Sequence, residues 1–239
     1  MFENPLVVGY KGEIGSFILQ GLLKFMPKAG NIWCFDINED EFEKQERIKK
    51  SDYIFLCVPL EETEKWIRKY MDLLKGKVIV EQCSLKTARE WNYFESLGIE
   101  FIHMHILFRP SSTPNPDDRE CMILTGPELS EHDKEFGQAM KTILGTSKVY
   151  ATCITLDEHD LEMAKQQALV HKAILVLDGM MHNNYGETFI VKKIGELADR
   201  IRSGDKKLYA RIQHNKYAGV ATIAFEQKLK VFDIDKYMP

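Results

Sequence analysis

Several features that often assign a protein to a class are missing from this sequence. Its 239 residues contain no apolar run long enough to span a bilayer, and no signal peptide is recognisable at the start. The five cysteines are dispersed without a C-x-x-C pair, which argues against a zinc site. The net charge is -4, so no positive excess points to nucleic acid. We therefore expect a cytoplasmic globular protein without a metal and without a membrane or nucleic-acid partner.

What the sequence does contain, near its N-terminus, is an apolar run that leads into a glycine cluster. Residues 6–8 are apolar, glycines follow at positions 9, 12 and 15, and a helical pattern begins directly after them. Strand, glycine turn and helix in this order bind pyrophosphate, because the turn lets the backbone approach and the helix N-terminus offers N–H groups. A second expected strand, 31–36, ends in Asp36. Its carboxylate is placed to bind a ribose diol, which favours NAD over NADP.

The glycine spacing departs from the usual fingerprint for dinucleotides. It reads G-x-x-G-x-x-G rather than G-x-G-x-x-G, which puts Tyr10 where the glycine of the tight turn belongs. A glycine turn without a dinucleotide stays open as the alternative. The residues predicted to bind the cofactor are Gly9, Tyr10, Lys11, Gly12, Glu13, Ile14, Gly15 and Asp36, with Val58 and Pro59 at the end of a later strand.

Alternating apolar runs and helical patterns indicate the fold class. Expected strands at 53–59, 77–81, 100–105, 121–125 and 147–150 alternate with helical stretches such as 63–74 and 130–144. This is the α/β pattern of a Rossmann-like, doubly wound, mostly parallel sheet, which we assign to residues 1–153. Residues 154–239 contain only helical patterns. One apolar stretch there is too long to bury alone, so this part is predicted to be an all-α domain that forms a homodimer.

Polar residues that carry chemistry follow two of the expected strands. Ser84 and Lys86 come after one strand, and His105 ends the next, before a loop rich in proline and small polar residues at 108–114. Ligands of open α/β sheets gather at this edge. A histidine beside a nicotinamide can accept the proton of a substrate hydroxyl, and a nearby serine can orient it. A purely structural His105 is the alternative, with His103 as the competing base.

Several segments, in order along most of the chain, resemble motifs of the prephenate/arogenate dehydrogenase family. The glycine turn is similar to that of the family, and residues 81–86 resemble its D-x-x-S-V-K segment. Residues 105–114 resemble H-P-M-F-G-P-x-x-x-P, with Ile106 and Arg109 in place of proline and glycine. Residues 158–171 resemble E-H-D-x-x-M-A-x-x-Q-x-L-x-H.

The resemblance implies oxidative decarboxylation of prephenate or arogenate with NAD, in a Rossmann-like domain followed by a helical dimerisation domain. Ser84 and His105 would be the catalytic residues, and His171 would help to form the substrate pocket. Lys192 stands where the family has an arginine for a substrate carboxylate. Arg109 could bind the same anion, and Lys86 completes the predicted substrate contacts.

Two other functions stay open. The same scaffold could act on another cyclic acid, or use another nucleotide such as S-adenosylmethionine for methyl transfer. It could also be a regulatory protein that binds NAD without catalysis.

Overall fold

The computed structural model describes residues 2–26, 31–86, 91–126, 128–181, 188–204 and 206–232, without the side chains of residues 207 and 208. The chain divides into two compact units, residues 1–156 and 157–239, which we describe separately. The first domain predicted from the sequence ends at residue 153, which is the last residue of strand β7.

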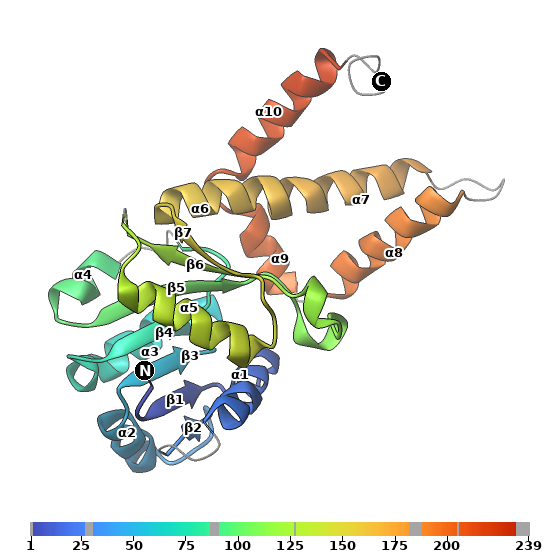
Figure 1. The fold of residues 1–239 in the computed structure, drawn as a ribbon. Coiled ribbons are helices and arrows are strands. Elements are labelled where there is room, and N and C mark those ends of the chain that lie inside the picture. The colour runs from blue at the N-terminus through green and yellow to red at the C-terminus, as the bar shows by residue number, and fades with distance from the viewer. Residues whose placement is uncertain are drawn as a thin grey trace. The chain divides into compact units, whose positions relative to one another are not determined.

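Unit 1 is built on a seven-stranded sheet (Figure 1). Its strands are β1 (Pro5–Val8), β2 (Trp33–Phe35), β3 (Tyr53–Leu56), β4 (Val78–Glu81), β5 (Glu100–Ile106), β6 (Cys121–Thr125) and β7 (Val149–Cys153). The strand order is β2-β1-β3-β4-β5-β6-β7, and only β5 and β6 pair antiparallel. The predicted α/β class with a mostly parallel sheet is confirmed.

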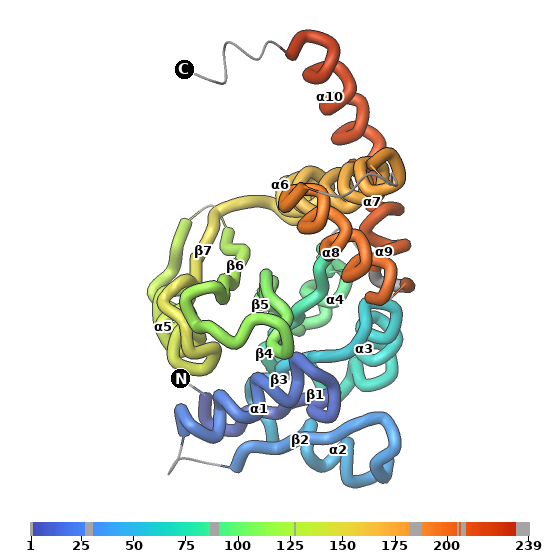
Figure 2. The backbone as a smooth tube through the Cα atoms, turned by 90° about the vertical axis from the view of Figure 1, so that its right-hand side faces the viewer, coloured from blue at the N-terminus to red at the C-terminus, as the bar shows by residue number. Residues whose placement is uncertain are grey.

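Helices cover both faces of this sheet, as Figure 2 shows. On one face lie α1 (Glu13–Phe25) and α5 (Glu131–Leu144); on the other lie α2 (Glu41–Lys50), α3 (Leu60–Leu74) and α4 (Trp91–Ser96). Because both faces are buried, the central strands are mostly apolar, and they separate two hydrophobic clusters. The connection from β5 to β6 contains two short 3-10 turns, η1 (Pro110–Ser112) and η2 (Pro116–Asp118).

The strand order fixes where a ligand site can form. Strand β1 has β2 on one side and β3 on the other, so the order of the strands reverses direction at β1. The connections diverge at the carboxyl end of β1 and leave a crevice there, which is the usual ligand position in such sheets. The glycine cluster begins at this point.

Unit 2 is helical in its described residues (Figure 1). Its elements are α6 (Leu156–Met163), the π-helical segment η3 (Ala164–Leu169), α7 (Val170–Met181), α8 (Phe189–Ser203), α9 (Lys206–Gln213) and α10 (Ala218–Lys230). Segments α6, η3 and α7 form one continuous helix interrupted by a π turn. This confirms the prediction of a helical C-terminal part.

Candidate active site

The turn after β1 can be built only from glycine at two positions. Gly9 has φ of +78°, and a Cβ there would lie 2.5 Å from the carbonyl oxygen of Cys57. A Cβ on Gly15 would lie 2.2 Å from the carbonyl oxygen of Gly9. The amide of Gly12 closes the turn on that same oxygen at 3.0 Å. The tight turn is therefore made by Gly9, one residue before the position that the fingerprint assigns and that Tyr10 fills.

Gly12 opens the site at the start of α1. It is the N-cap residue, it is exposed, and it offers no side chain between the helix end and a ligand. The first N–H groups of a helix have no partner within the helix and carry the positive end of its dipole. The turn thus presents donors to an anion at Gly12, where no side chain intervenes.

Asp36 follows the last residue of β2, and its carboxylate joins that strand end to the glycine turn. One oxygen accepts from the amide of Lys11 at 3.0 Å, and the other accepts from the amide of Ile37 at 2.8 Å. A carboxylate has about four acceptor positions, so a ribose diol can bind the remaining two. The backbone bonds hold the carboxylate in place for that contact.

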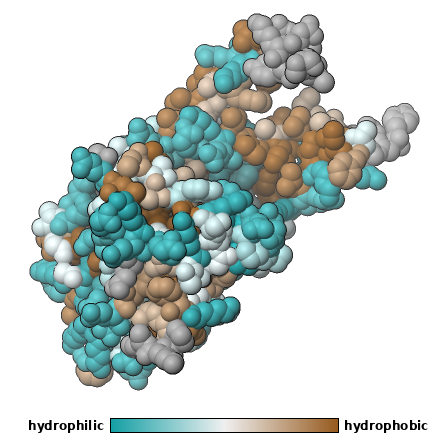
Figure 3. All heavy atoms as spheres, viewed as in Figure 1, coloured by the Kyte–Doolittle hydropathy of each residue, from teal (hydrophilic) through white to brown (hydrophobic). Residues whose placement is uncertain are grey.

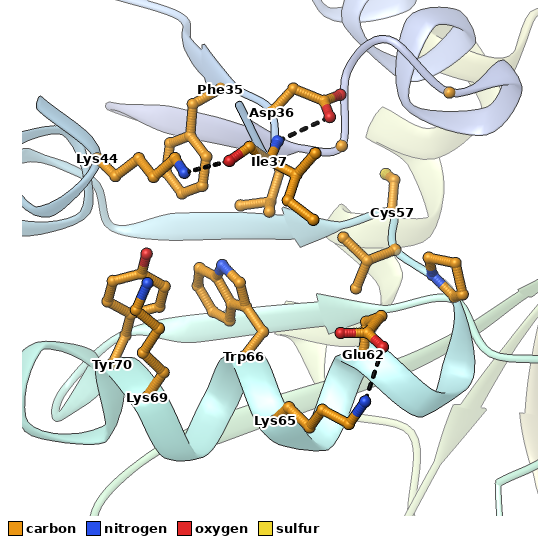
Figure 4. Close-up of a pocket in the computed structure, with 15 residues that line it drawn as sticks. Phe35, Asp36, Ile37, Lys44, Cys57, Glu62, Lys65, Trp66, Lys69 and Tyr70 are labelled. Carbon is orange, nitrogen blue, oxygen red and sulfur yellow. Dashed lines mark hydrogen bonds and ion pairs between the residues drawn. The ribbon is translucent and has the colours of Figure 1, made fainter. Parts of the chain in front are cut away.

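A pocket of about 490 Å³ lies between the end of β2 and helix α3 (Figure 4). The glycine turn, Asp36, Val58 and Pro59 line one part of it, and the side chains of Trp66 and Tyr70 line another. The Nε1 donor of Trp66 is buried and has no hydrogen-bond partner among the described residues. The size and the apolar walls suit an aromatic base joined to a ribose.

Trp66 and Tyr70 were not predicted from the sequence. They stand four residues apart on the buried face of α3, so their spacing is the same as that of ordinary core residues. Cys57 also lines the pocket. Burial raises the pKa of its thiol to about 12, so it acts as an apolar wall and not as a nucleophile.

The predicted catalytic residues follow neighbouring strands. Strands β4 and β5 run parallel, and Glu81 pairs with His103 in their register. Ser84 lies three residues beyond Glu81 and is half-buried, while His105 lies two residues beyond His103 and is buried. Both therefore lie at the carboxyl edge of the sheet, to which the glycine turn also belongs.

A buried charge cluster, formed by Glu81, Lys86 and His103, lies beside them. The Lys86 ammonium donates to Glu81 at 2.5 Å, the His103 ring bonds the same oxygen at 2.8 Å, and neither side chain of the ion pair is exposed. Burial by itself would raise the pKa of Glu81, but the charge of Lys86 and the bond to His103 outweigh it and lower that pKa. Lys86 is predicted to contact substrate, whereas its ammonium is enclosed in this pair.

The Glu81 cluster fixes the backbone next to both predicted catalytic residues. The second oxygen of Glu81 accepts from the amide of Cys83 at 2.9 Å, directly before Ser84. Lys86 donates to the carbonyl of Met104 at 2.7 Å, directly before His105. The cluster therefore holds two strand ends in one geometry. The sequence offers His103 only as a competing base, and its pairing with Glu81 depends on strand register.

Arg109, a predicted substrate contact, lies on the connection from β5 to β6. Its Nε donates to the carboxylate of Glu13 at 2.9 Å, and its side chain is 61% exposed. Arg109, which is predicted to bind the substrate, thus contacts Glu13, which is predicted to bind the cofactor.

His171 and Lys192 belong to unit 2. His171 lies on α7, edge-on to the ring of Tyr209 at 4.9 Å, and burial lowers its pKa. Its Nδ1 and the Oε1 of Gln167, one helical turn earlier in η3, are buried without a hydrogen-bond partner among the described residues. Such atoms are uncommon unless a ligand or water completes them. Lys192 lies exposed on α8.

Neither a membrane-spanning helix nor a metal-binding cluster is found among the described residues. Within them, no helix is both long and apolar enough to cross a membrane. The same residues hold no group of three or more His, Cys, Asp or Glu side chains placed to bind a metal ion.

The sheet topology and the glycine turn define a class of fold: a Rossmann-like α/β unit followed by a helical unit. Solved structures of this kind include the prephenate dehydrogenase of A. aeolicus in complex with hydroxyphenyl propionate and NAD+. The two are 17% identical, with a TM-score of 0.70, over 96% of this chain and 89% of that one. Comparison with protein-family models and with curated proteins gives no match.

Two further structures are similar. The arogenate dehydrogenase of Synechocystis is 16% identical with a TM-score of 0.62, over 95% of this chain and 89% of that one. The imine reductase of Myxococcus stipitatus in complex with NADP+ is also 16% identical, with a TM-score of 0.52, over 95% and 94%. At these identities the likeness establishes the fold.

Proposed function

We propose that this protein is a divergent, NAD-dependent oxidoreductase of the prephenate/arogenate dehydrogenase type. One observation carries the proposal: the glycine turn, the Asp36 carboxylate, Ser84 and His105 all lie at the carboxyl edge of one sheet. The ordered motifs of the sequence and the likeness in fold to two such dehydrogenases support it.

The residues of the turn and the pocket fit a dinucleotide. The absent side chains of Gly9 and Gly15 leave room for the close backbone packing, and the start of α1 would bind the pyrophosphate. Asp36 would bind the adenosine ribose, which favours NAD, because a phosphate on that ribose would be repelled by the carboxylate. Trp66 and Tyr70 would enclose the base.

The proposed chemistry needs one proton acceptor from the protein. When bound, NAD would supply the hydride acceptor for the ring carbon that bears the hydroxyl group. His105 takes the hydroxyl proton as the carbonyl forms, and Ser84 orients the imidazole or the substrate oxygen. Loss of carbon dioxide would then make the ring aromatic, and the resulting phenolate would take back the proton held by His105.

His171 and Lys192 are proposed to bind the substrate's polar groups. The unpartnered Nδ1 of His171 and Oε1 of Gln167 offer sites for a carboxylate or a hydroxyl group. Lys192 brings a positive charge without the bidentate geometry of arginine.

The first test is cofactor binding. Isothermal titration should show that NAD binds and that NADP binds more weakly. Asp36→Ala should weaken NAD far more than NADP. Equal losses for both dinucleotides, or no binding of NAD by the wild type, would contradict the cofactor assignment.

The second test is turnover. When prephenate and arogenate are each supplied together with NAD, the protein should oxidise at least one of them, with formation of NADH. His105→Asn should lower kcat about 100- to 10,000-fold and leave NAD affinity nearly intact, and kcat/KM should lose its acidic limb in the pH profile. If this variant keeps near wild-type kcat, His105 is structural, and His103 and His171 become the candidates.

A different substrate on the same scaffold is the second candidate function. Ile106 and Arg109 change the loop after the predicted base, and Lys192 replaces the family's arginine. NAD binding without turnover of either cyclic acid would favour this candidate or a non-catalytic role.

We also propose that the protein forms a homodimer through unit 2. Figure 3 shows apolar residues gathered on the surface of this unit. Large exposed apolar side chains lie on its helices at Met180, Phe189, Ile190, Val220, Ile223 and Leu229. A second copy would cover these side chains, because exposed apolar surface that is gathered in one region marks an interaction site. The free state of all five cysteines agrees with a cytoplasmic location.

A further inference from the structure

The connection from β5 to β6 is attached to the N-terminal end of α1. The Nε of Arg109 donates to one oxygen of Glu13 at 2.9 Å, and the amide of Ser111 donates to the other at 2.7 Å. Beside these bonds, the ring of Phe108 packs edge-on against Phe17 of α1 at 5.6 Å. Glu13 is therefore the polar point at which this connection meets the glycine turn.

Glu13 has the wrong charge for the ligand proposed at this helix end. It is the first residue of α1, next to Gly12, where the pyrophosphate of a dinucleotide would bind. Burial would raise the pKa of Glu13, but hydrogen bonds from Ser111 and Arg109 outweigh it, so its pKa is lowered. Glu13 is thus ionised at neutral pH, and two like charges a few ångströms apart repel each other.

We infer that Arg109 is a positioning residue for the cofactor, whose guanidinium cancels the charge of Glu13 beside the dinucleotide phosphates. This inference rests on the proposed NAD site. Under this inference, Arg109 acts on the binding of the cofactor and not, as the sequence predicts, on the binding of the substrate. The family motif that residues 105–114 resemble has glycine at this position. The arginine of this chain is explained by Glu13, whose negative charge beside the glycine turn needs a counter-charge.

The ion pair is exposed enough for solvent to moderate its effect. The side chain of Arg109 is 61% exposed and that of Glu13 is 33% exposed. The expected change in NAD affinity is therefore modest and sensitive to salt, since the screening length falls from about 10 Å at 0.1 M salt to about 3 Å at 1 M.

A double-mutant cycle on NAD affinity tests the inference without any substrate. By isothermal titration at low salt, Arg109→Ala should weaken NAD about five- to tenfold, the effect expected of one partly screened charge. Glu13→Gln alone should bind NAD at least as well as the wild type. The double variant Glu13→Gln/Arg109→Ala should return to within about twofold of the wild type. Arg109→Lys, which keeps the charge, should retain most of the affinity.

Two controls separate charge from structure. Lys134→Ala removes another exposed ion pair, with Glu131 on α5, and should leave NAD affinity unchanged. In about 1 M salt, the difference between Arg109→Ala and the wild type should largely disappear, which a purely structural role would not produce.

The outcomes distinguish the inference from the proposed function. If the double variant is as weak as Arg109→Ala, the effect of Arg109 does not pass through Glu13, and the inference is wrong. Wild-type affinity in Arg109→Ala, in a protein that binds NAD, also overturns the inference and leaves the proposed function standing. If the wild type binds neither NAD nor NADP, the proposed function fails and the inference fails with it.

Discussion

The two units of this protein bury very different amounts of their side chains. Unit 1 encloses two hydrophobic clusters, one on each face of its sheet, and even an ion pair between Glu81 and Lys86. The buried apolar cluster of unit 2 has three members among the described residues, Ala168, Ile212 and Ala218. Large apolar side chains remain exposed on its helices.

The difference shows that unit 1 buries most of its large apolar side chains within itself, whereas unit 2 leaves many of them exposed among the described residues. A sheet covered on both faces buries its apolar residues within one chain, whereas helices with broad apolar faces need a further partner. Buried polar atoms do not follow this division: Gln167 and His171 in unit 2 each keep one buried atom without a described partner, and so does Trp66 in unit 1.

Breaking the buried charges of unit 1 should have the largest effect. Lys86→Met leaves Glu81 ionised in an apolar interior, and we expect the free energy of unfolding to fall by about 3 to 5 kcal/mol. Urea unfolding followed by circular dichroism measures this. Lys49→Ala, which removes an exposed pair with Glu46, should cost less than about 1 kcal/mol. Equal losses of unfolding free energy in the two variants would mean that the buried pair stabilises the protein no more than the exposed pair does.

Acid should weaken unit 1 through the same carboxylate, by a smaller amount, because a protonated Glu81 still forms hydrogen bonds. Its pKa in the folded state is lowered from 4.5 to about 2. Its stabilising effect is therefore complete above about pH 4.5, the unfolded value, and is lost as the pH falls through about 2. The wild type and Glu81→Gln should differ most in unfolding free energy at neutral pH and least near pH 2. A difference in unfolding free energy that does not change with pH would contradict the lowered pKa of Glu81.

How far the sequence predicts the molecule also differs between its parts. Periodicity and glycine spacing predict the sheet, the turn and the helical C-terminal part, because these depend on local patterns. The bond between Glu81 and His103, and that between Arg109 and Glu13, were not predicted. The first pair is 22 residues apart and the second is 96, and neither spacing follows from a local rule. Trp66 was missed because a residue that lines a pocket from a helix has the same periodicity as a core residue.

In unit 2, the exposed apolar helix α10 offers the next comparison. If a second copy covers it, Ile223→Glu should raise the dissociation constant of the homodimer at least tenfold, about 1.4 kcal/mol. Sedimentation over a range of concentrations measures this. Gln227→Glu adds the same charge to the same helix at an exposed polar position and should have little effect. A wild type that is monomeric at micromolar concentration would show that another partner, or none, covers α10.

The smallest expected effect concerns His171, where burial lowers the pKa in the folded state. As the pH falls, the unfolded state therefore binds this proton first, so stability falls through the unfolded pKa and levels off below the folded one. NMR titration of the ring should give a lower pKa in the native protein than in urea, with His171→Asn used to assign the signal. If Nδ1 of His171 binds an anionic substrate, prephenate should raise that pKa, because a nearby negative charge favours the imidazolium. An unchanged pKa in the presence of a substrate that turns over would place the anion elsewhere and leave Lys192 as its candidate.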